Sequence, residues 1–388
     1  MFRKARPFAG AALSLASLLL VLGLAGCGGG RPVPKPSPPA GAPPVQRQAA
    51  VGWAAGYLIH GRKPPQTSTP VILATGDGGR TWTAQNPGAG LTDAQIEKVD
   101  FVNARDGWIL GVNERSDSSI ILATTDGGTS WRQQYADPYR ITGDILNAVS
   151  FVNPRDGWVA GVNQNTNSPV ILATTDGGSN WTPQHALRKV AWGLSSVFFA
   201  NPRDGWAVGG GILATTDGGR TWTVQNIPAG ISIAGLAGVS FAGAENGWVV
   251  GARTAGPYQN GMRFTPLILA TSDGGQTWSV QTLPSAADSS SFSFLQGVDF
   301  VNSRDGWAVA GGVLATTDRG RNWTLQTTTS GNLLRSVHFV NPKDGWAVGD
   351  RGVFLATTDG GTTWNQVQGL PSQAQSAYFS SVSFPRGQ

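Results

Sequence analysis

Charged side chains are scarce in this chain of 388 residues, of which only 13% are Asp, Glu, Lys or Arg. Cysteine occurs once, which excludes a disulfide within the chain. The three histidines (His60, His185 and His338) are far apart in sequence and give no metal-ligand spacing. Long helices would need more Glu, Lys and Leu than the chain contains. We therefore expect no metal, no cofactor and little helix.

Glycine, proline and tryptophan are abundant, at 54, 24 and 15 residues. Gly and Pro favour turns, and Trp fills the interfaces between sheets. The hydrophobic fraction of 40% is too high for a disordered chain. The composition therefore favours many short strands joined by tight turns.

The formal net charge of +5 comes largely from Arg3, Lys4 and Arg6, which lie in an N-terminal targeting segment. The rest of the chain carries 25 basic and 23 acidic residues and is close to neutral. It contains no basic run and no nucleic-acid-binding motif, so nucleic acid is not an expected partner.

The N-terminus has the layout of a secretory signal, with basic residues, an apolar stretch from Phe8 to Ala25 and then small residues. Leu24-Ala25-Gly26-Cys27 resembles the lipobox of bacterial lipoproteins, in which the cysteine sulfur carries a diacylglycerol. An ordinary signal peptide, or a membrane anchor with an incidental cysteine, is the alternative. Cys27 is the only cysteine and occupies the position that the lipobox requires, so we predict that it is lipidated.

This interpretation divides the chain into a signal peptide (1–26), lipidated Cys27 with a Gly/Pro-rich tether (27–50) and a folded domain (51–388). The domain would lie outside the cytoplasm, at the cell surface, in the periplasm or on the lumenal side of a thylakoid. It would be anchored to the membrane by lipid without spanning it.

A turn of the form T-x-D-G-G-x-x-W, with Arg319 in place of the first glycine in one copy, recurs seven times and is similar to the Asp-box of known propellers. Successive aspartates are 49, 50, 41, 56, 45 and 41 residues apart, a period that fits one four-stranded blade. The seven aspartates are Asp77, Asp126, Asp176, Asp217, Asp273, Asp318 and Asp359.

Two further motifs, V-x-F and mostly D-G-W, precede the turn, so each repeat predicts four short strands: V-x-F, G-W-x-x-G, I-L-A-T-T and W-x-x-Q. This scheme places every tryptophan except Trp192. The first copy begins at Val51 without a V-x-F strand, and the missing strand occurs at Tyr378–Phe384. We therefore predict an all-β, seven-bladed β-propeller whose C-terminal strand completes the N-terminal blade, which leaves no open sheet edge.

The repeat aspartates have a structural explanation. An Asp in such a turn accepts hydrogen bonds from backbone N–H groups of its own turn. Seven copies spread around a ring cannot converge on one substrate. The same interpretation applies to the aspartates of the D-G-W motif, which are Asp106, Asp156, Asp204, Asp305 and Asp344.

The other connections vary and should lie on the opposite face of the ring, which we call the variable face. The connection between the second and third strands is three residues at Gly209–Gly211 and sixteen at Gly251–Pro266. Irregular loops on a rigid scaffold are common binding sites, so this is the predicted functional face. Its acidic residues gather between 93 and 144, whereas later loops are mainly basic; chance clustering on a solvated rim is the alternative.

An enzyme is the second hypothesis, because sialidases and other glycoside hydrolases use Asp-box propellers. Glycoside hydrolysis usually needs two carboxylates that face one sugar. Eleven acidic residues remain once the repeat aspartates are set aside, and the early Phe/Tyr-Arg-Ile-Pro signature of sialidases is absent. Tyr258 and Glu114 are the best-placed catalytic candidates for a sialidase-like enzyme, and a glycan-binding lipoprotein is a further alternative. We predict no catalytic residues.

The segment VHFVNPKDGWAVGDRGVFLATTDGGTTW (Val337 to Trp364) resembles the repeat of the photosystem II stability/assembly factors, and the likeness extends over residues 51–384. Cyanobacterial members of that family are similar in carrying a lipobox. The resemblance implies a non-enzymatic seven-bladed propeller that binds early assembly intermediates of the photosystem II reaction centre, partly through an arginine-rich patch. By this analogy the partner-binding residues are Arg188, Lys189, Arg253, Arg263, Arg335 and Arg351.

Overall fold

The structure is a computed structural model that describes residues 50–61, 67–88, 91, 93–113, 118–134, 144–184, 190, 192–258, 261–288 and 290–385. The predicted signal peptide, Cys27 and the tether lie outside these residues. So do Glu114, Arg188 and Lys189. Among the described residues, no helix is long and apolar enough to cross a membrane.

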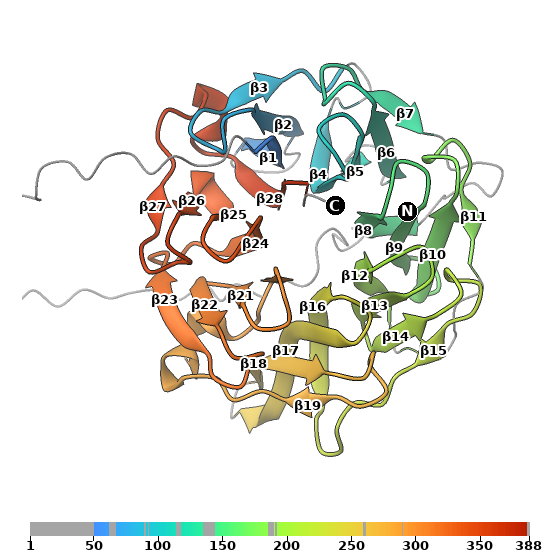
Figure 1. The fold of residues 1–388 in the computed structure, drawn as a ribbon, viewed down its shortest axis with the longest axis vertical. Helices are drawn as coiled ribbons and strands as arrows, with labels where there is room; N and C mark the ends of the chain where they lie inside the picture. The colour runs from blue at the N-terminus through green and yellow to red at the C-terminus, as the bar shows by residue number, and fades with distance from the viewer. Residues whose placement is uncertain are drawn as a thin grey trace, which may run out of the picture. The chain divides into compact units, whose positions relative to one another are not determined.

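Seven four-stranded antiparallel sheets form a ring, which confirms the predicted seven-bladed propeller (Figure 1). We number the blades by their second strands, beginning with the sheet that contains β1. The inner strands of blades 1 to 7 are β28 (Tyr378–Ser383), β4 (Ala94–Phe101), β8 (Asp144–Phe151), β12 (Leu194–Phe199), β16 (Ile233–Ala242), β20 (Gly297–Phe300) and β24 (Leu334–Phe339). The second strands are β1 (Gly52–His60), β5 (Gly107–Asn113), β9 (Gly157–Asn163), β13 (Gly205–Gly209), β17 (Asn246–Tyr258), β21 (Gly306–Val309) and β25 (Gly345–Gly349).

The third and outer strands complete each sheet. The third strands are β2 (Thr67–Thr75), β6 (Ser118–Thr124), β10 (Ser168–Thr174), β14 (Ile212–Thr215), β18 (Gly261–Thr271), β22 (Gly312–Thr316) and β26 (Phe354–Thr357). The outer strands are β3 (Thr83–Gln85), β7 (Arg132–Gln134), β11 (Thr182–Pro183), β15 (Thr223–Val224), β19 (Ser279–Val280), β23 (Thr324–Thr328) and β27 (Asn365–Gln366). Short 3-10 helices lie in the connections, at η2 (Ser285–Asp288), η3 (Ser290–Phe292), η4 (Asp350–Gly352) and η5 (Ser372–Ala374).

The ring closes in the first blade, as predicted from the two ends of the repeat. Strand β28 is the inner strand of this blade and pairs antiparallel with β1, so that Trp53 lies opposite Ser383. The sheet order β28-β1-β2-β3 therefore joins the two ends of the domain through backbone hydrogen bonds. Strand β1 therefore has a partner on both sides, as the second strand of every other blade does.

Neighbouring blades meet through a repeated aromatic stack. Trp53 of blade 1 lies flat on Phe101 of blade 2, with ring centroids 3.4 Å apart and planes inclined by 2°. The indole Nε1–H of Trp53 donates to the carbonyl of Gly127 in the same neighbouring blade at 3.0 Å. Equivalent stacks occur at all seven junctions, with tryptophans Trp108, Trp158, Trp206, Trp248, Trp307 and Trp346 at the other six.

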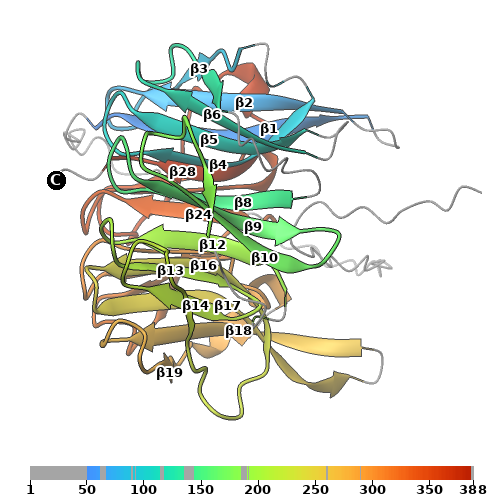
Figure 2. The same cartoon turned by 90° about the vertical axis from the view of Figure 1, so that its right-hand side faces the viewer.

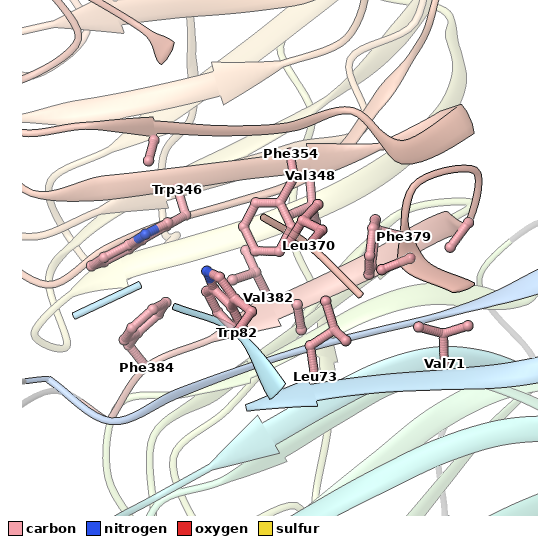
Figure 3. Close-up of a cluster of buried hydrophobic side chains, with 14 residues drawn as sticks. Val71, Leu73, Trp82, Trp346, Val348, Phe354, Leu370, Phe379, Val382 and Phe384 are labelled. Carbon is pink, nitrogen blue, oxygen red and sulfur yellow. The ribbon is translucent and has the colours of Figure 1, made fainter. Parts of the chain in front are cut away.

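The closing junction, between blades 7 and 1, has the same construction. Trp346 stacks on Phe384 with centroids 3.8 Å apart, and Trp82 meets the same phenyl ring edge-on. Figure 3 shows these rings packed with Val382 and Leu73. Both faces of every sheet are covered by a neighbouring blade, so the second strand Gly205–Gly209 is buried at every position. This burial explains why G-W-A-V-G is apolar throughout and does not alternate.

One expectation about the variable face is wrong. Gly251–Pro266 was expected to be an irregular loop, but the segment extends β17 and β18 as a paired ribbon with a bulge between Thr254 and Pro257. Figure 2 shows this hairpin projecting from the ring. The register continues without a break from Gly251 opposite Leu267 to Thr254 opposite Phe264, so this part of the segment is a regular two-stranded ribbon.

The closure yields the first prediction. Phe384→Ala removes a ring that is 1% exposed and stacked at the closing junction, so it should lower the free energy of unfolding by about 3–5 kcal/mol. Urea titration followed by tryptophan fluorescence measures this loss. Val280→Ala, at a residue 39% exposed on an outer strand, should change stability by less than about 0.5 kcal/mol. Equal losses in the two variants would contradict the closure account.

Candidate functional site

The carboxylate of each repeated box turn is engaged within its own turn. In blade 2, Asp126 Oδ1 accepts from the hydroxyl of Thr124 at 2.8 Å and the N–H of Ser130 at 2.9 Å. Its Oδ2 accepts from the Ser130 hydroxyl at 2.6 Å. These donors, the Ser130 hydroxyl foremost, lower the pKa of Asp126 to about 2. The carboxylate is thus a fixed acceptor, not a proton donor or nucleophile.

The box turn and the D-G-W turn lie on one face, which we call the box face. Gly127 N–H donates to the carbonyl of Arg105, and Arg105 Nε donates to the carbonyl of Thr125. Asp106 accepts from the side-chain amide of Asn103 at 2.8 Å. The backbone hydrogen bond between the two turns recurs in blades 3 to 7, with Arg319 N–H as the donor in blade 6. The repeat residues therefore hold the scaffold together on this face.

The middle residue of the V-x-F strand links neighbouring blades at five of the seven junctions. Phe151 N–H of blade 3 donates to Asp100 of blade 2 at 2.7 Å, and Phe339 N–H of blade 7 donates to Asp299 of blade 6 at 2.8 Å. At three other junctions the phenylalanine N–H donates to a serine hydroxyl, which belongs to Ser150, Ser240 or Ser383. These contacts could not be predicted from the V-x-F motif, because its middle position varies among Asp, Ser, Phe and His.

The channel encloses a cavity of about 390 Å³, lined by residues that include Lys98, Asp100, Phe198, Asp299 and His338. Burial raises the pKa of Asp100 to about 6, against the lowering effect of the Phe151 N–H. Among the described residues, no group of three or more His, Cys, Asp and Glu is arranged to hold a metal ion. Asp100 and Asp299 each accept a backbone N–H of the neighbouring blade. These hydrogen bonds compensate for the loss of water around the two carboxyl groups.

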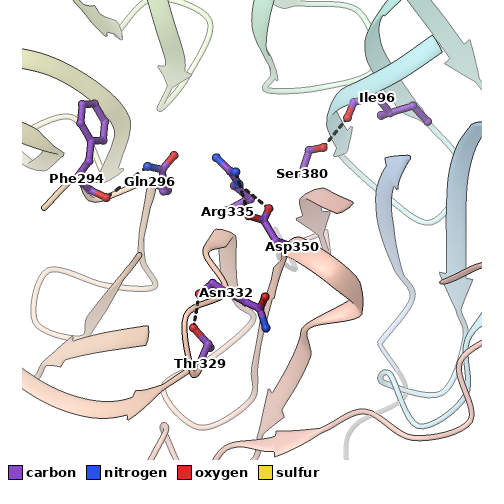
Figure 4. A network of polar contacts seen from close by, with 8 residues as sticks. All are labelled: Ile96, Phe294, Gln296, Thr329, Asn332, Arg335, Asp350 and Ser380. Atoms are coloured by element: carbon purple, nitrogen blue, oxygen red, sulfur yellow. Dashed lines mark hydrogen bonds and ion pairs between the residues drawn. The ribbon is translucent and has the colours of Figure 1, made fainter. Parts of the chain in front are cut away.

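The mouth of the channel on the variable face holds a polar network (Figure 4). Arg335 forms a bidentate pair with Asp350, with Nε–Oδ1 at 2.9 Å and Nη2–Oδ2 at 3.1 Å. Ser380 donates to the carbonyl of Ile96 at 2.6 Å nearby. Arg335 was predicted to bind the partner, but its guanidinium already has an intramolecular carboxylate. Its side chain is 31% exposed, and the pairing makes it a poor choice for an intermolecular contact.

Burial perturbs other groups at this mouth. It raises the pKa of Glu97, although Lys98 and Arg335 act in the opposite direction. It lowers the pKa of Lys98, against the attraction of Glu97. Burial also raises the pKa of the Tyr57 hydroxyl, with Glu97 adding to the effect. The predicted acidic sector therefore loses Glu97 as a solvated charge.

The structure does not bring the remaining candidate arginines into one patch. Arg253 and Arg263 lie on the β17–β18 hairpin of blade 5. Arg351 is exposed in the turn after β25 of blade 7, with a positive φ of 55°. Blade 6 separates the two places. The side chain of Tyr258, the enzyme candidate, lies outside the described part of the chain.

Trp192 is the residue that the repeat scheme left over, and it is the most exposed large hydrophobic side chain described, at 50%. It precedes the inner strand of blade 4 and lies against the turn at Gly210 on the variable face. In the sequence, Trp192 could be singled out because it is the one tryptophan that lies outside the repeat motifs.

Comparison with models of known families identifies the repeat. The model described as "Photosynthesis system II assembly factor YCF48" matches residues 88–191, 138–223 and 324–388, which together make up about half of the chain. The chain belongs to this family. No curated protein matches the sequence.

Solved structures of the family share the fold. The chain is 21% identical to a structure titled "YCF48 bound to D1 peptide", with a TM-score of 0.52 over 72% of this chain and 84% of that one. YCF48 from Cyanidioschyzon merolae gives the same identity and TM-score, over 71% and 87%. A GH74 enzyme from Niastella koreensis is 15% identical with a TM-score of 0.30, over 78% of this chain and 59% of that one, and supports no functional argument.

The raised pKa of Asp100 predicts that the stability of the domain depends on pH. Its pKa is about 6 in the folded state against an ordinary value of 3.8, so the folded state holds its proton more tightly than the unfolded state. Raising the pH from about 4 to about 6 therefore favours unfolding. Asp100→Asn keeps an acceptor for Phe151 N–H but cannot titrate, so its stability relative to the wild type should rise by up to about 3 kcal/mol across that interval.

Urea unfolding at pH 4, 5, 6 and 7 measures the difference. Ser150→Ala removes the equivalent side chain from the next blade without removing a titrating group, so its stability difference from the wild type should not change with pH. A constant difference between Asp100→Asn and the wild type would show that Asp100 is not the titrating group.

Proposed function

We propose that this protein is a non-enzymatic propeller that binds a protein partner on its variable face during assembly of photosystem II. Family membership carries the proposal, because the chain belongs to the YCF48 assembly factors. The structure titled "YCF48 bound to D1 peptide" supports a polypeptide as the ligand. For this chain, we propose a segment of a reaction-centre polypeptide as the partner.

The geometry supports the variable face over the box face. The box face is occupied by the repeat turns, whose carboxylates and backbone groups bond to one another. The variable face carries side chains that no repeat uses, among them Arg263, Arg351 and Trp192, all of them exposed. Side chains that differ between blades can distinguish one partner from another, whereas sevenfold repeated turns cannot.

A glycosidase is the weaker candidate. Hydrolysis needs two carboxylates that face one sugar. Asp100 and Asp299 line the channel but each accepts a backbone N–H from the neighbouring blade, and the box aspartates are fixed in their turns. Turnover of a panel of fluorogenic glycosides that is lost in Tyr258→Phe or Glu114→Gln would overturn the non-enzymatic assignment.

We also propose that Cys27 carries a lipid that anchors the domain outside the cytoplasm. The lipobox-like sequence before Cys27 supports this proposal. Expression of the full chain with labelled palmitate should label the wild type, and the protein should partition into detergent. Cys27→Ala should lose both properties. A labelled Cys27→Ala variant would contradict lipidation at this residue.

Partner capture can be tested by charge reversal. Replacing Arg253, Arg263 and Arg351 by Glu should reduce recovery of reaction-centre subunits from solubilised thylakoid membranes by about tenfold or more, because these cations lie on the variable face. The matched control replaces the exposed Arg132, Arg220 and Arg321, on an outer strand and two box turns, by Glu.

The control makes the same change in net charge but should retain capture. Thermal unfolding checks that both triple variants remain folded. Equal capture by the two triple variants would place the binding surface elsewhere, and recovery of cell-wall glycan in place of reaction-centre subunits would contradict the proposed function.

A further inference from the structure

Two neighbouring blades differ sharply in height on the variable face. Strands β13 and β14 of blade 4 are joined by only Gly210 and Gly211. The next blade extends β17 to Tyr258 and returns through β18 from Gly261. A short glycine turn in blade 4 therefore lies beside a hairpin of blade 5 that extends further out on the variable face. We call this place the step and define it by Trp192, Gly210, Gly211, Arg253 and Arg263.

Trp192 covers the low side of the step. A Cβ at Gly210 would lie 2.6 Å from Trp192 Cδ1, so the indole rests against the turn only because residue 210 has no side chain. The ring is 50% exposed, whereas the other tryptophans are buried or half-buried in repeat positions. An indole held against backbone with half its surface in solvent is typical of an anchor for a partner.

The hairpin presents its arginines to the same side. Val249, Leu267 and Leu269 pack against Trp206, Val208 and Ile212 of blade 4 in one cluster. Side chains alternate along a strand. Arg253 comes after Val249 at an even spacing on β17, and Arg263 and Thr265 come before Leu267 at even spacings on β18. All three therefore face blade 4 above that cluster. Arg253 Nε donates to Thr265 Oγ1 at 3.3 Å, and this hydrogen bond orients the Arg253 side chain toward β18.

Among the described residues of the strands and turns of blades 4 and 5, no carboxylate lies on the variable face; Asp288, in η2 of the connection to blade 6, follows a residue that packs on the opposite face of the sheet, against Val250 and Ile268. Besides Asp273 of the box turn, the acidic residues between 192 and 280 are Asp204, Asp217 and Glu245. All three lie in turns of the box face, where Gly218 N–H meets the carbonyl of Arg203 and Gly274 N–H meets that of Glu245. The step thus combines an exposed aromatic surface with cations that this part of the chain leaves uncompensated.

From this arrangement we infer that the step binds an extended acidic segment of the protein partner. Trp192 packs on an apolar side chain of the segment, and Arg253 and Arg263 bind its carboxylates. Guanidinium groups only donate hydrogen bonds, so they select carboxylates over the hydroxyls of a neutral glycan, which need both donors and acceptors. The inference rests on the proposed function and specifies the chemistry of its partner.

The test uses the folded mature chain and a short labelled peptide with glutamates on both sides of one leucine. Trp192→Ala should weaken binding by about tenfold or more. Trp192→Phe should retain most of it, and Gly210→Ala should weaken it because the new methyl group displaces the indole. Lysines in place of the glutamates should abolish binding, and added salt should weaken it.

Matched controls remove similar groups from other places. Val224→Ala and Val280→Ala truncate residues 42% and 39% exposed on outer strands, and Arg220→Glu reverses an exposed charge in the box turn of blade 4. All three should leave peptide affinity unchanged. A second readout is iodide quenching of tryptophan fluorescence. The peptide should protect the wild type from quenching and leave Trp192→Ala unaffected, because Trp192 is the most exposed indole.

The outcomes separate this inference from the proposed function. Equal peptide affinity of Trp192→Ala and the wild type would overturn the step, even if reaction-centre subunits are still captured. Tighter binding of a neutral oligosaccharide than of the acidic peptide would also overturn it. If the peptide binds at the step but the mature chain captures no reaction-centre subunit, the proposed function fails and the step stands.

Discussion

The stack of a tryptophan on the phenylalanine of the next blade is the interaction on which this molecule depends. Each phenyl ring is held between two residues of the same motif in different copies. Trp53 covers Phe101 from blade 1, and Gly107 of Phe101's own blade leaves room for the ring, since a Cβ there would lie 2.4 Å from it. The G-W pair therefore has a physical cause: the glycine admits its own blade's ring and the tryptophan covers the next.

The need to keep this stack at every junction divides the residues into those that maintain the ring and those that can vary between blades. Six of the stacking tryptophans donate their indole N–H to the next blade, the box carboxylates bond within their own turns, and the aspartates in the middle of two V-x-F strands accept from the next blade. Residues that repeat around the ring maintain the ring. Residues free to differ lie at the channel mouth, in the β17–β18 hairpin and beside the short turn of blade 4, and there a single partner can be recognised.

The fold could be predicted from the sequence because its determinants are local and repeated. Spacing of the box aspartates gave the blade number, and the missing V-x-F strand before Val51 gave the closure that β28 confirms. Contacts between copies at non-repeated positions could not be predicted. The pairing of Arg335 with Asp350 depends on a turn particular to blade 7, and the extended hairpin depends on pairing across a segment rich in Gly and Pro. The sequence showed only that Trp192 lies outside the repeat motifs; its exposure and its contact with Gly210 could not be predicted.

The central claim is that the repeats build the scaffold and the variable face recognises the partner. Hydrogen exchange of the mature chain, with and without the captured reaction-centre subunit, tests this claim most directly. The account predicts slower exchange at 192–194, 209–212 and 251–266 on the variable face, with the box turns unchanged. Slower exchange confined to the box turns, from Asp77 to Trp82 and their equivalents, would contradict it.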